Sequence, residues 1–151
     1  MMRVKNVLTI ITGAIPFVVG SILNRALIEQ SDSVLPLIRI GLLFLSFWGI
    51  VAFVFQNRMK NAKRVVVLLN AIAAIDLLLL GIQELVIHAY WGNVIGGWSQ
   101  LFYLPVIKIG FLLTNWSHTV FSAYVVSFVL MIVVSVLGCR IRIWQSQLDN
   151  K

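Results

Sequence analysis

The sequence contains few charged residues. Asp, Glu, Lys and Arg make up 11% of its 151 positions, and only five of these residues are acidic. Soluble domains average about a quarter charged residues. Hydrophobic residues make up 60% of the chain, more than a water-soluble core of this size could bury, so lipid must be the solvent for most of it. The composition predicts one membrane domain over residues 1–151 and excludes a separate soluble domain.

Cysteine and histidine are also scarce. Cys139 is the single cysteine, which excludes an internal disulfide. Glu84 and His88 stand four residues apart and could bind a metal on one helical face, with His118 as a third ligand. Such a pair is common by chance and no further His or Cys spacing supports it, so we expect no metal and no cofactor. No serine-nucleophile motif is recognisable either, which makes an enzyme the less expected class.

Long apolar runs predict the fold class, an all-α integral membrane protein with four transmembrane helices in a bundle. A bilayer is spanned by about 17–25 apolar residues. The first run could instead be a signal peptide cleaved near Gly20 and Ser21, but its apolar part is longer than a usual signal core, so we favour a helix that stays. The predicted spans cover approximately residues 7–27, 35–55, 65–90 and 119–138.

Residues 92–118 connect the third and fourth predicted spans. Tryptophan and tyrosine concentrate at the membrane surface, where the ring is half in water. We therefore expect an interfacial or re-entrant segment on the outer side. The alternative, an extra span from Leu104 to Trp116, is too short to cross comfortably and would place the C-terminus outside. The aromatic residues of this segment are Trp98, Phe102, Tyr103, Phe111 and Trp116.

The distribution of positive charge predicts the orientation. Gln56 to Arg64 holds four cations and no acid, and such basic connections stay in the cytoplasm. With both termini inside, nine of the 12 Lys and Arg lie inside and three, Arg25, Arg39 and Lys108, lie outside. We predict a plasma-membrane protein with cytoplasmic ends. Its net charge of +7 does not indicate a nucleic-acid partner, because the basic residues stand in short clusters between apolar runs.

Residues 139–151 are predicted to form a cytoplasmic tail. Ile141, Trp144 and Leu148 recur at helical spacing beside Arg140 and Arg142, which fits a short helix along the anionic inner leaflet. A frayed polar end is the alternative.

The third predicted span carries polar side chains on one broad helical face. A central Asp costs about 2.5–3.5 kcal/mol on insertion, and each Leu, Ile or Val returns roughly 0.3–0.6 kcal/mol. Insertion is therefore feasible, but Asp76 must face the bundle, where it is protonated or finds a partner. The expected hydrogen-bond partners are Thr9, Thr12, Ser46, Ser122 or Asn70.

Closer to the outer surface, we predict that Arg39 pairs with Glu84, with Lys108 or Arg25 nearby. The result is a polar pocket that opens outward. Its predicted binding residues are Asp76, Gln83, Glu84, His88, Arg39 and Lys108.

Two function classes fit these features. The first is an accessory or regulatory membrane protein that binds another membrane protein or itself in the lipid bilayer, which the small size and short loops favour. The second is a small ion- or proton-coupled transporter or channel that uses Asp76 and Glu84. A lipid-active enzyme with Glu84 and His88 at the outer interface is a weaker third. Asp76 could also serve packing alone.

Overall fold

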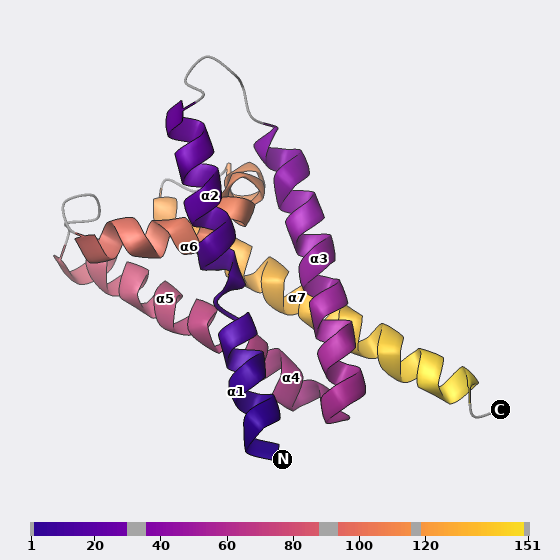
Figure 1. The fold of residues 1–151 in the computed structure, drawn as a ribbon. Coiled ribbons are helices and arrows are strands. Elements are labelled where there is room, and N and C mark those ends of the chain that lie inside the picture. Colours follow the sequence, from indigo (N-terminus) through magenta and orange to yellow (C-terminus); the bar gives the residue numbers. More distant parts are fainter. Residues whose placement is uncertain (1, 30–35, 88–93, 116–118, 150–151) are drawn as a thin grey trace.

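The computed structural model describes residues 2–29, 36–87, 94–115 and 119–149, and the described residues form helices and no strands. The all-α prediction is therefore confirmed. The elements in chain order are α1 (Met2–Thr12), α2 (Ile15–Glu29), α3 (Leu37–Met59), α4 (Ala62–Leu69), α5 (Ala71–Ile82), the π-helix η1 (Gln83–Ile87), α6 (Val94–Leu113) and α7 (Val120–Leu148) (Figure 1).

Three helical stretches in the described residues are long and apolar enough to cross a membrane. They are Val4–Glu29, which combines α1 and α2, Leu37–Met59 and Val120–Leu148. The pair Ala62–Leu69 and Ala71–Ile87 passes the same test together, and it adds a fourth candidate if the two helices count as one span. The apolar runs of the sequence thus reappear as long helices.

The third predicted span is not one straight helix. A bend of 44° separates α4 from the helical stretch that follows it. Asn70 stands at the bend, and its side-chain Nδ2 donates to Val66 O at 2.9 Å, an acceptor that the Asn70 backbone N–H also uses at 3.2 Å. A polar side chain that bonds to the carbonyl one turn earlier bends a helix. Residues 88–90 of the predicted span lie outside the described residues.

The aromatic-rich connection forms α6, which packs against α2, α3, α5 and α7 (Figure 1). Trp98 is 59% exposed, whereas Phe102 and Tyr103 are at most 2% exposed, so the expectation that their rings are half in water is wrong for Phe102 and Tyr103. The physical reason is the spacing of the apolar residues: Phe102, Tyr103 and Val106 lie on one helical face and bury it in the core.

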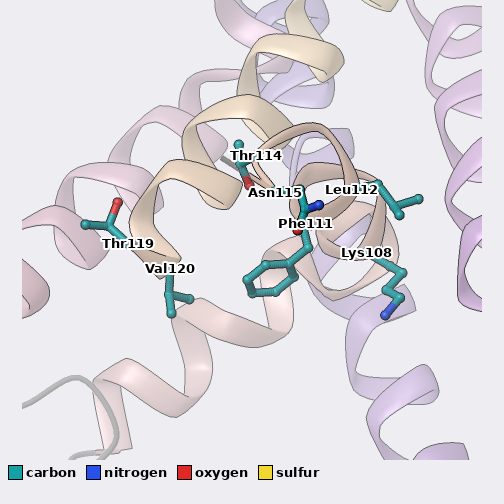
Figure 2. A pocket seen from close by; sticks show the side chains of 7 residues that line it. All are labelled: Lys108, Phe111, Leu112, Thr114, Asn115, Thr119 and Val120. Atoms are coloured by element: carbon teal, nitrogen blue, oxygen red, sulfur yellow. The ribbon is translucent and has the colours of Figure 1, made fainter. Parts of the chain in front are cut away.

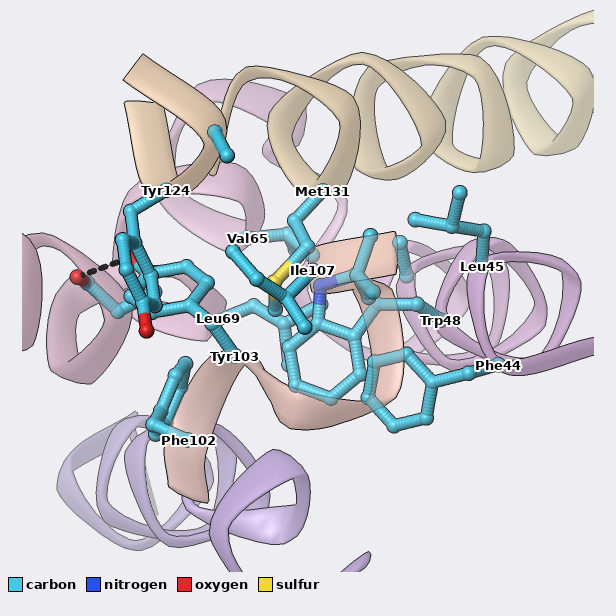
Figure 3. Close-up of a cluster of buried hydrophobic side chains, with 14 of the residues drawn as sticks. Phe44, Leu45, Trp48, Val65, Leu69, Phe102, Tyr103, Ile107, Tyr124 and Met131 are labelled. Atoms are coloured by element: carbon cyan, nitrogen blue, oxygen red, sulfur yellow. Dashed lines mark hydrogen bonds between the residues drawn. The ribbon is translucent and has the colours of Figure 1, made fainter. Parts of the chain in front are cut away.

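The core gathers large side chains around the middle of α6 (Figure 3). Trp48 of α3, Leu69 of α4 and Met131 of α7 are fully buried beside Tyr103. The rings of Tyr103 and Tyr124 meet edge to face at 5.6 Å. Since lipid supplies no hydrophobic force between helices, such packing and the hydrogen bonds between helices must hold a membrane bundle together.

Polar contacts hold three segments together at one end of the molecule. Lys5 Nζ donates to Arg58 O at 3.1 Å, and Arg142 Nε and Nη2 donate to Asn57 Oδ1 at 3.2 and 2.6 Å. The start of α1, the end of α3 and the last part of α7 therefore share one end (Figure 1), which we call the basic end after Lys5, Arg58, Lys60 and Arg142.

α7 runs without interruption from Val120 to Leu148, so the predicted tail continues this helix instead of forming a separate one. Its 29 residues span about 43 Å at 1.5 Å per residue. A hydrocarbon layer is about 30 Å thick. The last turns of α7 therefore exceed what is needed to cross a membrane.

Candidate functional site

Asp76 lies on α5, and its side chain accepts a hydrogen bond from Ser99 of α6. One turn along α6, the Tyr103 hydroxyl donates to Ala73 O at 2.6 Å. Ala73 and Asp76 are three residues apart on α5, and Ser99 and Tyr103 are four apart on α6, so each pair shares a helical face. The two helices are thus joined by two polar contacts through adjacent turns.

The second carboxylate oxygen of Asp76, Oδ2, is buried and has no hydrogen-bond partner among the described residues. A buried acceptor without a donor costs about 1–3 kcal/mol. A proton on the carboxyl group or a bound cation would remove that cost. The position therefore suits packing, proton binding or cation binding.

The partners predicted for Asp76 are wrong. The hydroxyls of Thr9, Thr12 and Ser46 donate to the backbone carbonyls four residues earlier, and that of Ser122 donates to Thr119 O. Hydroxyl side chains inside helices commonly bond this way, because the carbonyl of the preceding turn is within reach. Ser99 was the missed partner, and its position in a buried part of α6 follows from tertiary packing.

Two other predicted site residues lie close by along the chain, and one cannot be placed. Gln83 is buried at the start of η1, two turns beyond Asp76, and Glu84 beside it is partly buried. His88 lies outside the described residues. A π-helical turn inside a helix frequently marks a functional site, so η1 keeps Gln83 and Glu84 as candidates.

Arg39 does not join this group. It is exposed near the start of α3, and in the described part of the chain no ion pair links it to Glu84. The observed ion pair is Arg25–Glu29, between residues four apart on α2 and with both side chains more than half exposed. Such an exposed pair contributes little to stability.

Lys108 does not join the group either. It is exposed and nine residues after Ser99, which places it on the opposite face of α6. It lines a different cavity of about 490 Å³ between the end of α6 and the start of α7 (Figure 2), together with Phe111, Leu112, Thr114, Asn115, Thr119 and Val120.

A second buried polar cluster was not predicted as a site. Asn70 Oδ1 accepts from Trp48 Nε1 at 3.2 Å, and Asn70 Nδ2 donates to Ser135 Oγ at 3.1 Å. All three residues are buried, so the cluster links α3, the bend between α4 and α5, and α7. The available signal was Trp48, a tryptophan deep within an apolar run, where its N–H needs an acceptor.

Metal ligands do not cluster in the part of the chain that the structure describes, where no group of three or more His, Cys, Asp or Glu could hold an ion. His88 and His118, which the sequence offered as ligands with Glu84, lie outside it.

Comparison with known proteins adds no relative. The sequence matches no protein-family model and no curated protein, and the fold matches no solved structure. The function must therefore be argued from the chain's own residues.

Proposed function

We propose that this chain is a four-span protein of the plasma membrane with both termini in the cytoplasm, and that it acts as an accessory or interaction subunit. Its spans are α1–α2, α3, the bent pair α4–α5, and α7, with α6 held among them. The basic end is cytoplasmic, since basic segments stay inside. The partner is another membrane protein or a second copy of the chain.

One observation carries the proposal: the half-buried Asp76 is bonded between two helices, and the cavities named above and below are lined by other residues. Asp76, Ser99 and Tyr103 bond across α5 and α6, and four cavities in the described part of the chain are lined by residues other than Asp76. Two of these cavities have mainly apolar linings on the helix surfaces. A path for ions needs polar groups along an opening, whereas an interaction subunit needs an outer surface that a partner can cover.

Flux and cross-linking together test the proposal. Purified protein in liposomes should pass no more H⁺, Na⁺ or K⁺ than empty liposomes. In native membranes, photo-crosslinking residues are placed at Val18, Phe47 and Leu78, which are exposed on α2, α3 and α5. At least one position should give a single adduct that mass spectrometry identifies as this chain or one other membrane protein. Ion flux by the purified protein, or lipid adducts alone at all three positions, would contradict the proposal.

A second function, proton- or cation-coupled transport through Asp76, is favoured by its buried Oδ2. Asp76→Asn keeps the size and the acceptor for Ser99 but cannot carry a proton, so transport should fail. If Asp76 serves packing, Asn should be tolerated and Asp76→Leu should destabilise the protein by about 1 kcal/mol, since Ser99 loses its acceptor. Liposome flux and unfolding of both variants separate the two roles. If both variants behave as the parent, Asp76 has neither role.

A further inference from the structure

We infer that the α3–α7 face at the basic end binds one phospholipid with an anionic headgroup. Its acyl chain lies in the apolar groove between the two helices, and its phosphate lies beside Arg142 and Lys60. The inference rests on the proposed function in one respect, that the chain spans a membrane with its basic end at the cytoplasmic leaflet.

The groove between α3 and α7 has the size and lining that an acyl chain requires. Its volume is about 620 Å³, within the roughly 300–1,000 Å³ of small-molecule sites. Gly49 and Gly138 line it where the helices meet, so close that a Cβ on Gly138 would lie 2.1 Å from Gly49 O. Leu42 and Ile50 flank it and are more than half exposed. Ser46 is its one polar lining residue, and its hydroxyl already donates to Leu42 O.

A polar cavity of about 320 Å³ lies farther along the same helix pair, at the basic end. Two of its lining residues are cations and none is acidic. Arg142 makes no ion pair in the described part of the chain, and its contacts to Asn57 use Nε and Nη2, so Nη1 still has N–H groups to donate. The lining residues are Gln56, Asn57, Lys60, Arg142, Ile143 and Ser146.

The groove and the polar cavity meet at Phe53 and Arg142. Phe53 lines the groove, Arg142 lines the cavity, and the Arg142 Cζ lies 5.4 Å from the Phe53 ring centre. Arg142 is four residues beyond Gly138, a rise of about 6 Å along α7. A single molecule can therefore place an apolar chain against Gly138 and a phosphate against Arg142.

The backbone at Lys60 supports a role for its side chain. Lys60 ends α3 in the left-handed conformation with φ 55°, where glycine is the usual residue. Residues held in such conformations concentrate at ligand clamps and other functional positions. Here the strained position carries a cation on the cavity wall. Anionic lipids of the cytoplasmic leaflet supply the matching charge.

Native mass spectrometry tests the inference, with phosphatidylglycerol titrated into purified protein against phosphatidylcholine of the same chain length. The parent should bind one phosphatidylglycerol with roughly ten-fold preference, and the variant with Lys60→Gln and Arg142→Gln should lose that preference. The matched control carries Lys63→Gln and Arg64→Gln. It also removes two positive charges, both from positions close to Lys60 in the chain, but leaves the cavity wall intact, so it should keep the preference.

Two further variants keep the test decisive. Lys60→Gln alone leaves the Arg142–Asn57 contact in place, so it should lower the preference severalfold even if the double variant fails to fold. Ile50→Phe fills the groove and should weaken phosphatidylglycerol binding with the cations intact. If both double variants lose the preference for phosphatidylglycerol equally, the attraction depends on overall positive charge and not on the cavity, which would overturn the proposed site. If soluble glycerol phosphate binds as tightly as phosphatidylglycerol, the site binds a free anion, and the proposed lipid is wrong.

Failure of this inference is distinguishable from failure of the proposed function. Ion flux by the purified parent would contradict the accessory role and leave the lipid preference unchanged. Loss of the lipid preference in both double variants would contradict the lipid site, but it would not affect the identification of a cross-linked partner.

Discussion

Gly20→Ala is expected to destabilise the protein strongly. Gly20 lies on α2 where that helix crosses α6, and a Cβ added there would stand 1.7 Å from Leu101 O. The obstacle is backbone, so no change of rotamer can relieve it. The two helices must separate or shift along each other, and the expected cost is about 3 kcal/mol, the upper end of the usual cost of overpacking.

The free energy of unfolding in mixed micelles, measured by titration with a denaturing detergent, checks this prediction. Gly97→Ala is the matched control, since it adds the same methyl group to a helix at a glycine with no other atom within 4 Å of the new Cβ. In a helix, alanine is favoured over glycine by about 0.5–1 kcal/mol, so Gly97→Ala should be neutral or stabilising. Equal effects of the two substitutions would show that α2 and α6 do not meet at Gly20.

The same contact shows what the sequence could and could not predict. The helical class follows from composition, because lipid leaves helices as the way for long apolar segments to satisfy their backbone groups. In the sequence, Gly20 and Ser21 also fit the small residues before a signal-peptide cleavage site, the less favoured alternative. The crossing with Leu101, some eighty positions away, depends on tertiary packing that no local pattern encodes.

Some of the polar contacts could be predicted from the sequence and others could not. Asp76 could be identified from the sequence because an acidic side chain inside an apolar run is costly in lipid, so it usually has a partner or a function. Its partner Ser99 could not, since a serine in an aromatic-rich connection also suits a surface segment. The expected pair of Arg39 and Glu84 assumed that equal depth implies contact, yet Arg39 is exposed near the start of α3. The depth of a residue in the membrane can be estimated along one helix. The sequence does not show which helix faces contact each other.

Asn70→Leu is the second substitution with a large expected effect. Asn70 accepts from Trp48 Nε1 at 3.2 Å and donates to Ser135 Oγ at 3.1 Å. Leucine removes the acceptor Oδ1 and leaves the fully buried Trp48 N–H without this partner, whereas Ser135 keeps its own bond to Met131 O. An unsatisfied buried donor costs about 1–3 kcal/mol. The bend at Asn70 also loses its side-chain contact to Val66 O, so we expect a loss of about 2–3 kcal/mol.

A double-mutant cycle separates the Trp48 contact from the other effects of Asn70→Leu. Trp48→Phe removes the donor, so Asn70→Leu should cost less in that background. Couplings between helices in membranes average about 0.6 kcal/mol and reach about 1.7 kcal/mol, and the full burial of Trp48 places the expected coupling in the upper part of that range. The control is Ser135→Ala with Trp48→Phe, which should couple more weakly than Asn70→Leu with Trp48→Phe, because Ser135 bonds Asn70 Nδ2 and meets the indole only through Asn70. Leucine favours membrane insertion over asparagine, so lower stability of Asn70→Leu would reflect the lost polar contacts and not poorer insertion. Additivity of Asn70→Leu and Trp48→Phe would mean that the indole N–H does not depend on Asn70.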